Sequence, residues 1–267
     1  MTVTLLSDYA RGFVKLARDT WIIFQRQMVI MLRTPIWLFF AIAQPVTYLF
    51  LFTPFLEKAL VPMGAKSLAD AYNIYVPGLL VIMCLYGGLF AGFGLLAELR
   101  AGIVERARVT PISRLALLLG RALRDVTSFL MQCALITVFA LPFGLSVGLV
   151  DLLLAYLLLS LIGLMAAAIS YDVALLIRNE GALGPLINTV GQPVALLAGV
   201  LLPLAIAPLW IQQASRWNPF SWATDGTRAL FRGQTADPAV WQGFAIVAVL
   251  AVVTIVWSAR LFSRTIR

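Results

Sequence analysis

Long apolar runs with few interruptions are the main pattern along this 267-residue chain. A helix that crosses the hydrocarbon core of a bilayer needs about 20 mostly apolar residues. Six segments meet that requirement, so the pattern predicts an all-α integral membrane protein with six transmembrane helices. The predicted spans are residues 36–56, 74–97, 115–141, 152–177, 182–203 and 238–259.

The third predicted span is the least uniform of the six. Arg121, Arg124 and Asp125 lie near its start, and the apolar run itself begins only at about residue 122. We therefore expect this helix to begin in water and then to enter the lipid. Arg121 and Asp125 stand four residues apart, a spacing at which the two side chains can pair on one helix face.

Composition supports the membrane interpretation and excludes others. The chain is 61% hydrophobic and only 12% charged, with a mean hydropathy of +0.94. That leaves too little polar surface for a soluble globule. The formal net charge of +8 does not indicate a nucleic-acid partner, because the basic residues are scattered between lipid-length segments. Cys84 and Cys133 both fall within apolar runs, which argues against a disulfide framework.

The distribution of basic residues predicts the orientation. If the N-terminus is cytoplasmic, fifteen of the twenty Lys and Arg residues fall in the inner segments and five in the outer ones. Cytoplasmic segments carry the excess of Lys and Arg. We therefore expect a multi-pass protein of a bacterial inner membrane with both termini in the cytoplasm.

The stretch before the first span, residues 8–34, predicts an amphipathic helix. Basic residues gather on one side, while apolar residues recur at helical spacing on another: Phe13, Leu16, Ala17, Trp21, Phe24, Met28 and Met31. Such a helix fits the inner headgroup layer of a membrane. A cytoplasmic extension of the first span is the alternative.

Residues 98–114, between the second and third spans, concentrate charge of both signs in the sequence ELRAGIVERARVTPISR. A solvated turn that enforces topology is the simplest interpretation, but an inside anchor would need only Lys and Arg. Ile103, Val104 and Ala107 share one side of a short helix that Pro111 ends, and Ser113 can cap the next helix. The pattern favours a short amphipathic helix that docks onto a partner.

Several stretches together resemble the permease subunits of ABC-2 type exporters, in particular the daunorubicin-resistance-type drug exporters. They are YVPGLLVIMCLYGGLFAGFGLLAELRAGIVERARVTPISRLALLLGR (75–121), LRTPIWLFFAIAQPVTYLFLF (32–52), LLIRNEGALGPL (175–186) and LLAGVLLPLAIAPLWIQQASRWNPFSWATDGTRALFRG (196–233). Their order along the chain carries the resemblance. This sequence departs from it at Ala101, where many relatives have Arg, and at Glu105, where Asp is common.

The resemblance implies two permease copies, identical or related, above two ABC ATPase subunits. The loop between spans two and three would then be a coupling helix that sits in a cleft of the ATPase. The residues expected to couple to the ATPase are Glu98, Arg100, Gly102, Glu105, Arg106, Arg108 and Pro111. The implied cargo is a small hydrophobic or amphiphilic drug, a natural product or a lipid, and a lipid-linked polysaccharide is the alternative.

We expect no cofactor on this chain, with ATP and Mg²⁺ on the partner subunit. A Walker A loop needs Gly-Lys followed by Ser or Thr. The three lysines, Lys15, Lys58 and Lys66, follow Val14, Glu57 and Ala65 instead.

Two further groups of residues are candidates for packing and gating. Gly88 and Gly92 form a GxxxG pattern in span two, which allows close helix approach within the subunit or at a seam between permeases. The outer segment 204–237 contains Trp210, Asn218 and Pro219. By the resemblance it would form short re-entrant helices that gate the exit, although its tryptophans also suit an aromatic belt.

Two other classes of membrane protein fit less well. The chain has no histidine, which excludes Ser–His proteolysis and the HExxH zinc site. A metal site of another kind is not indicated, since no Asp-rich motif is present. In a secondary transporter, buried ionisable residues would mark the pathway. Only Asp172 is a candidate for such a role, and we expect it to reach the inner surface or to pair with an arginine.

Overall fold

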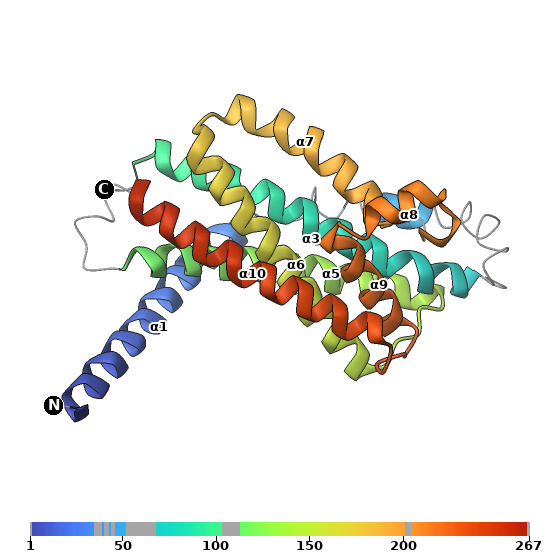
Figure 1. The fold of residues 1–267 in the computed structure, drawn as a ribbon, viewed down its shortest axis with the longest axis horizontal. Helices are drawn as coiled ribbons and strands as arrows, with labels where there is room; N and C mark the ends of the chain where they lie inside the picture. The colour runs from blue at the N-terminus through green and yellow to red at the C-terminus, as the bar shows by residue number, and fades with distance from the viewer. Residues whose placement is uncertain are drawn as a thin grey trace.

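The computed structural model describes residues 2–34, 39, 43, 46–51, 68–102, 113–200 and 204–265, and these residues contain helices and no strand (Figure 1). This confirms the all-helical prediction for the described part. The helices are α1 (Thr2–Leu32), α3 (Leu68–Arg100), α5 (Arg114–Ala140), α6 (Leu149–Ile177), α7 (Glu180–Leu197), α8 (Leu209–Ser215), α9 (Pro219–Phe231) and α10 (Pro238–Thr265). Two short 3-10 helices lie between them: η2 (Leu141–Phe143) between α5 and α6, and η3 (Leu204–Ile206) between α7 and α8.

Four stretches of the described helices are long and apolar enough to cross a membrane: Tyr72–Arg100, Leu115–Phe143, Leu149–Ile177 and Pro238–Phe262. They cover the predicted spans 74–97, 115–141, 152–177 and 238–259, and they make the chain a multi-pass membrane protein. Helix α7, with 18 residues, covers most of the predicted span 182–203 but is not one of the four. The predicted span 36–56 lies mostly outside the described residues, although residues 46–51 are helical.

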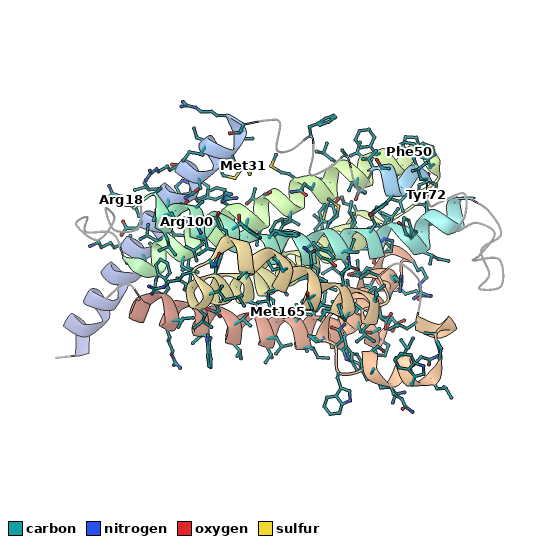
Figure 2. All side chains as sticks on the ribbon, turned by 90° about the horizontal axis from the view of Figure 1, so that it is seen from above. Arg18, Met31, Phe50, Tyr72, Arg100 and Met165 are labelled. Atoms are coloured by element: carbon teal, nitrogen blue, oxygen red, sulfur yellow. The ribbon has the colours of Figure 1, made fainter. Side chains whose placement is uncertain are left out.

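The long helices run between two ends of one bundle (Figure 1). At one end, here called the α1 end, α3 and α6 finish, α5 and α7 begin, and α10 carries the C-terminus. At the other, the α9 end, α3, α6 and α10 begin beside α8 and α9. Figure 2 shows Arg18 and Arg100 toward the α1 end, Tyr72 toward the α9 end and Met165 between them.

Helices α3 and α6 form the centre of the bundle, and small residues let them approach closely. Ser170 of α6 accepts a hydrogen bond from the backbone N–H of Gly92 at 3.0 Å and donates one to the carbonyl oxygen of Leu89. A Cβ atom at Gly92 would lie 2.5 Å from Ser170 Oγ, and one at Gly88 would lie 2.6 Å from the Cβ of Ala166. The GxxxG pattern therefore lies against α6 of the same chain.

Helix α1 packs on α5 around Ile23, while its N-terminal part projects away from the bundle (Figure 1). Ile23 is buried, and a Cβ atom at Gly120 of α5 would lie 2.7 Å from its Cγ2 atom. Trp21, Val29 and Ile30 remain about half exposed, at 53%, 48% and 53%. The helix thus has one face fixed to α5 and an apolar face left open. Helix α5 itself begins as predicted, because Ser113 Oγ accepts a hydrogen bond from the N–H of Ala116 at 3.0 Å.

Gly92→Val should destabilise the bundle, because the new side chain must push α3 away from Ser170. Overpacking of this kind costs about 1–3 kcal/mol. We expect a lower thermal unfolding midpoint for the purified protein in detergent.

Gly184→Ala is the matched control. The nearest atom to a Cβ there, the Cζ of Phe93, lies 3.6 Å away, which is ordinary contact. Equal midpoints for the two variants would show that the α3–α6 contact does not need Gly92.

Candidate functional site

One carboxylate joins three helices at the α1 end. Glu98, near the end of α3, accepts a hydrogen bond from Gln27 Nε2 of α1 at 2.7 Å. The same oxygen, Oε1, lies 2.6 Å from Arg121 Nη2 of α5, and the Arg121 side chain is only 4% exposed. We call this group of Gln27, Glu98 and Arg121 the carboxylate tie. The carboxylate tie connects α1, α3 and α5 through a single oxygen atom.

The predicted pairing of Arg121 with Asp125 is wrong. Arg121 pairs with Glu98 of the neighbouring helix, whereas Asp125 pairs with Arg124 at 2.7 Å and accepts a hydrogen bond from Tyr171 Oη of α6. Arg121 thus has its partner on another helix, whereas Asp125 combines a neighbour on α5 with a partner on α6. Together the two pairs extend polar contacts across four helices.

Two of the remaining residues predicted to couple to an ATPase have simple structural roles. Arg100 Nη1 forms an exposed ion pair with Glu180 Oε2 at 2.9 Å, which joins the end of α3 to the start of α7. Gly102 has a φ of 66°, and its N–H donates to the carbonyl of Leu99, so it ends α3 in a left-handed conformation. The other four predicted residues, Glu105, Arg106, Arg108 and Pro111, lie outside the described residues.

At the α9 end a buried arginine holds three helices together. Arg228 of α9 is 6% exposed and donates to the carbonyl oxygens of Gly199 at 2.7 Å, Val200 at 3.3 Å and Ile74 at 3.4 Å. Gly199, with a φ of 65°, follows the last turn of α7. A cation placed at carbonyls beyond a helix C-terminus is stabilising. Burial lowers the pKa of Arg228 to about 10, so the guanidinium remains charged at neutral pH.

Two of the quoted stretches, 75–121 and 196–233, meet at this arginine. Gly78, in YVPG, has no Cβ, and any Cβ there would collide with the carbonyl oxygen of Val200. Pro77 beside it lies inside α3 and lacks the N–H that would bind the carbonyl of Asn73. The stretches around residues 77, 199 and 228 therefore meet at one point. Sequence reasoning missed this cluster and counted Arg228 only as an outer charge.

The predicted outer-gate residues lie in the segment that caps the α9 end. Asn218 caps α9 by accepting from the N–H of Phe220 at 3.1 Å, and its Nδ2 donates to the carbonyl of Val194 in α7 at 2.7 Å. Pro219 occupies the first turn of α9. Trp210, on α8, is 68% exposed. Asn218 thus links α9 to α7, while Trp210 faces the surroundings.

One exposed face of the bundle is polar and aromatic, and sequence reasoning missed it as well. Helix α7 buries a single stripe, and the exposed remainder includes Asn188, Thr189 and Gln192. Beside it on α3, Tyr86 stacks on Phe90, and Phe90 on Phe93, with ring centroids 6.2 and 5.9 Å apart. The two helices touch where a Cβ at Gly191 of α7 would lie 3.4 Å from the Tyr86 ring. We call this surface the α3–α7 face. The sequence signal for this face was the presence of these polar residues within the predicted span 182–203.

Pairing with an arginine, one of the two outcomes expected for Asp172 of α6, is not found among the described residues. No arginine among the described residues lies within ion-pair distance of it, and its Oδ1 atom has no hydrogen-bond partner. Within the described residues no group of three His, Cys, Asp or Glu side chains could hold a metal ion.

Comparison with known proteins places these features in a family. The family model described as ABC-2 type transporter matches residues 18–231. The putative transport permease ycf38 of Cyanophora paradoxa is 26% identical over 217 residues, which is 80% of this chain and 74% of the relative. The daunorubicin resistance ABC transporter permease protein DrrB1 of Streptomyces coeruleorubidus is 23% identical over 210 residues, 78% and 73% of the two chains.

The carboxylate tie should contribute far more to the free energy of unfolding than the exposed ion pair of Arg100 with Glu180. Glu98→Ala leaves the buried Arg121 guanidinium without its anion, a change that costs about 3–5 kcal/mol in buried pairs. Glu180→Ala removes a carboxylate from a solvent-exposed pair, worth roughly 0–1 kcal/mol. Thermal midpoints of the two purified variants provide the comparison.

A double-mutant cycle between Glu98→Ala and Arg121→Ala measures their coupling directly. Additive effects of the two substitutions would contradict the tie.

Proposed function

Because this chain belongs to the ABC-2 type transporter family, we propose that it is the permease subunit of an ABC exporter. It forms the membrane pathway for a small hydrophobic or amphiphilic drug, natural product or lipid. ATP hydrolysis on a separate ATPase subunit drives the transport, and ATP and Mg²⁺ bind there. The daunorubicin-resistance name of one relative supports a small amphiphilic cargo. A lipid-linked polysaccharide is the alternative cargo.

The α3–α7 face is the observation that carries this proposal. Between Gln242 and Arg260, which are exposed near the two ends of α10, the exposed large side chains of this helix are apolar, as expected of a lipid-facing helix: Val249, Val252, Val253, Val256 and Trp257. On α7, by contrast, Asn188, Thr189 and Gln192 are exposed in the middle of the helix, among exposed apolar side chains that include Leu186, Val190 and Leu196. Amide side chains in contact with hydrocarbon lose their hydrogen bonds to water, which is costly. The α3–α7 face therefore suits a pathway for water and cargo, closed on its far side by a second permease copy.

The aromatic side chains of this face suit an amphiphilic cargo. Tyr86, Phe90 and Phe93 offer stacking surfaces beside the amide groups of α7. Apolar walls with a few polar groups are typical of small-molecule sites. A polysaccharide would need more hydroxyl and amide partners than this face offers.

The carboxylate tie suits the coupling role. Movement of α1 or of the loop after α3 reaches α3 and α5 through Glu98, and α3 carries the aromatic side of the pathway. On this proposal the α1 end is cytoplasmic, both termini are inside, and the chain has six spans in a bacterial inner membrane. The arginines of the α1 end, which include Arg18, Arg26, Arg33, Arg100, Arg121, Arg124 and Arg178, support that orientation.

Replacing the amides of the pathway should impair transport without uncoupling the motor. For Asn188→Leu/Gln192→Leu we expect at least a several-fold loss of export in proteoliposomes that contain the ATPase, with basal ATP hydrolysis retained. Val190→Leu, at a 55% exposed position of α7 outside the polar group, is the control. Normal export by the double variant would contradict a pathway on this face.

Reversing the charges of the loop after α3 tests its proposed docking onto the ATPase. Arg106→Glu/Arg108→Glu removes the positive charge expected to meet the ATPase, so ATP hydrolysis should continue without export while membrane insertion is unchanged. Hydrolysis and export are measured on the same vesicles. Export at the rate of the unaltered protein would contradict the docking role of the loop.

A further inference from the structure

A cavity of about 320 Å³ opens at the α9 end, beside the buried arginine. Ile74 of α3 and Leu204 and Ala205 of η3 form its apolar part. Its polar part consists of Asn73, Asp225, Arg228 and Arg232. The cavity thus joins an apolar wall to charges of both signs, and no role described above uses it.

The charges of the cavity are not paired with one another. Arg228 uses Nε and Nη2 for the carbonyls behind it, and no hydrogen bond joins its Nη1 to a described residue. Arg232 Nε donates to the carbonyl oxygen of Arg228 at 3.3 Å. Among the described residues, Asp225 lies within ion-pair distance of neither arginine. Two guanidinium groups and one carboxylate therefore face the cavity with a net positive charge.

The position of the cavity along the bundle indicates which ligands reach it. Trp210 and Trp217, 68% and 91% exposed, lie in the same segment of the α9 end. Exposed tryptophans gather at the level of lipid headgroups. The apolar part of the cavity suits the start of an acyl chain, and guanidinium groups bind phosphate oxygens through charge-assisted hydrogen bonds.

We propose that this cavity binds the phosphodiester group of an amphiphile whose headgroup also carries an amine. Arg232 and the Nη1 group of Arg228 hold the phosphate, and the amide nitrogen of Asn73 supplies a further donor. Asp225 holds the ammonium group. Desolvation raises the pKa of Asp225, while the neighbouring Arg228 and Arg232 lower it. The inference depends on the proposed function only for the assignment of the α9 end to the outer leaflet.

Lipid binding to the full-length protein tests this assignment without any need for transport. In nanodiscs we expect phosphatidylethanolamine to be retained in preference to phosphatidylglycerol, as counted by native mass spectrometry after detergent release. Arg232→Gln should lower phosphatidylethanolamine retention about tenfold, the effect of one charge-assisted hydrogen bond. Arg232 is chosen because Arg228 also holds the fold together.

Arg216→Gln is the matched control, because this exposed arginine ends α8 in the same segment but does not line the cavity. Equal losses in the two variants would overturn the site, since they would reflect the surface charge alone. Asp225→Asn should equalise the two lipids. An unchanged preference would overturn the ammonium contact.

Inorganic phosphate distinguishes the two sources of the anion. A millimolar excess should leave the bound lipid in place, because phosphate lacks both the acyl chain and the amine. Displacement by phosphate would assign the cavity to a free anion and contradict the headgroup. Failure of these binding tests leaves the export measurements unaffected, so the two proposals fail separately.

Discussion

Polar groups that are cut off from water by hydrocarbon need partners, and this requirement determines where the helices of this bundle are joined. At the α1 end one carboxylate, Glu98, serves both Gln27 and Arg121. At the α9 end one guanidinium, Arg228, serves three carbonyls from α3 and from the end of α7. Between these ends, α3 and α6 are held by close packing around Gly92 and Ser170. Charged groups with hydrogen-bond partners thus join the helices at both ends of the bundle, and close packing joins them in the middle.

The exposed amides of α7 depart from that rule, and the departure is informative. Asn188 donates only to a carbonyl of its own helix, that of Gly184 at 3.1 Å, and the side chain stays exposed. A helix that buries one narrow stripe and leaves its amides open is suited to a surface that water or a partner covers. The ties at both ends involve α3: Glu98 belongs to it, and Arg228 donates to the carbonyl oxygen of Ile74 in it as well as to those that follow α7. Motion at the α1 end can therefore reach the α3–α7 face through α3 itself.

The sequence could predict features that depend on residues close together along the chain. It could predict far fewer of the contacts between residues that are distant along the chain and meet only in the folded bundle. Apolar length predicted the long helices, and the Pro-Ile-Ser-Arg stretch predicted the cap by Ser113. Spacing along a single helix gave Arg121 the wrong partner, because Glu98 comes from another helix. The contacts of Arg228 were equally out of reach, since the carbonyl of Ile74 is 154 residues away in the chain. Asn188 and Gln192 were visible as polar residues within a span, but their exposure was not.

Water access to α7 distinguishes a transport pathway on the α3–α7 face from a helix that faces lipid. In a variant with Cys84 and Cys133 replaced by alanine, a single cysteine is placed at Gln192 or, for comparison, at Val253 on the apolar face of α10. A membrane-impermeant maleimide is then applied to intact membranes and to opened vesicles. We predict labelling at position 192 from at least one side and none at position 253. Absence of labelling at both positions would place α7 against lipid and contradict a transport pathway along the α3–α7 face.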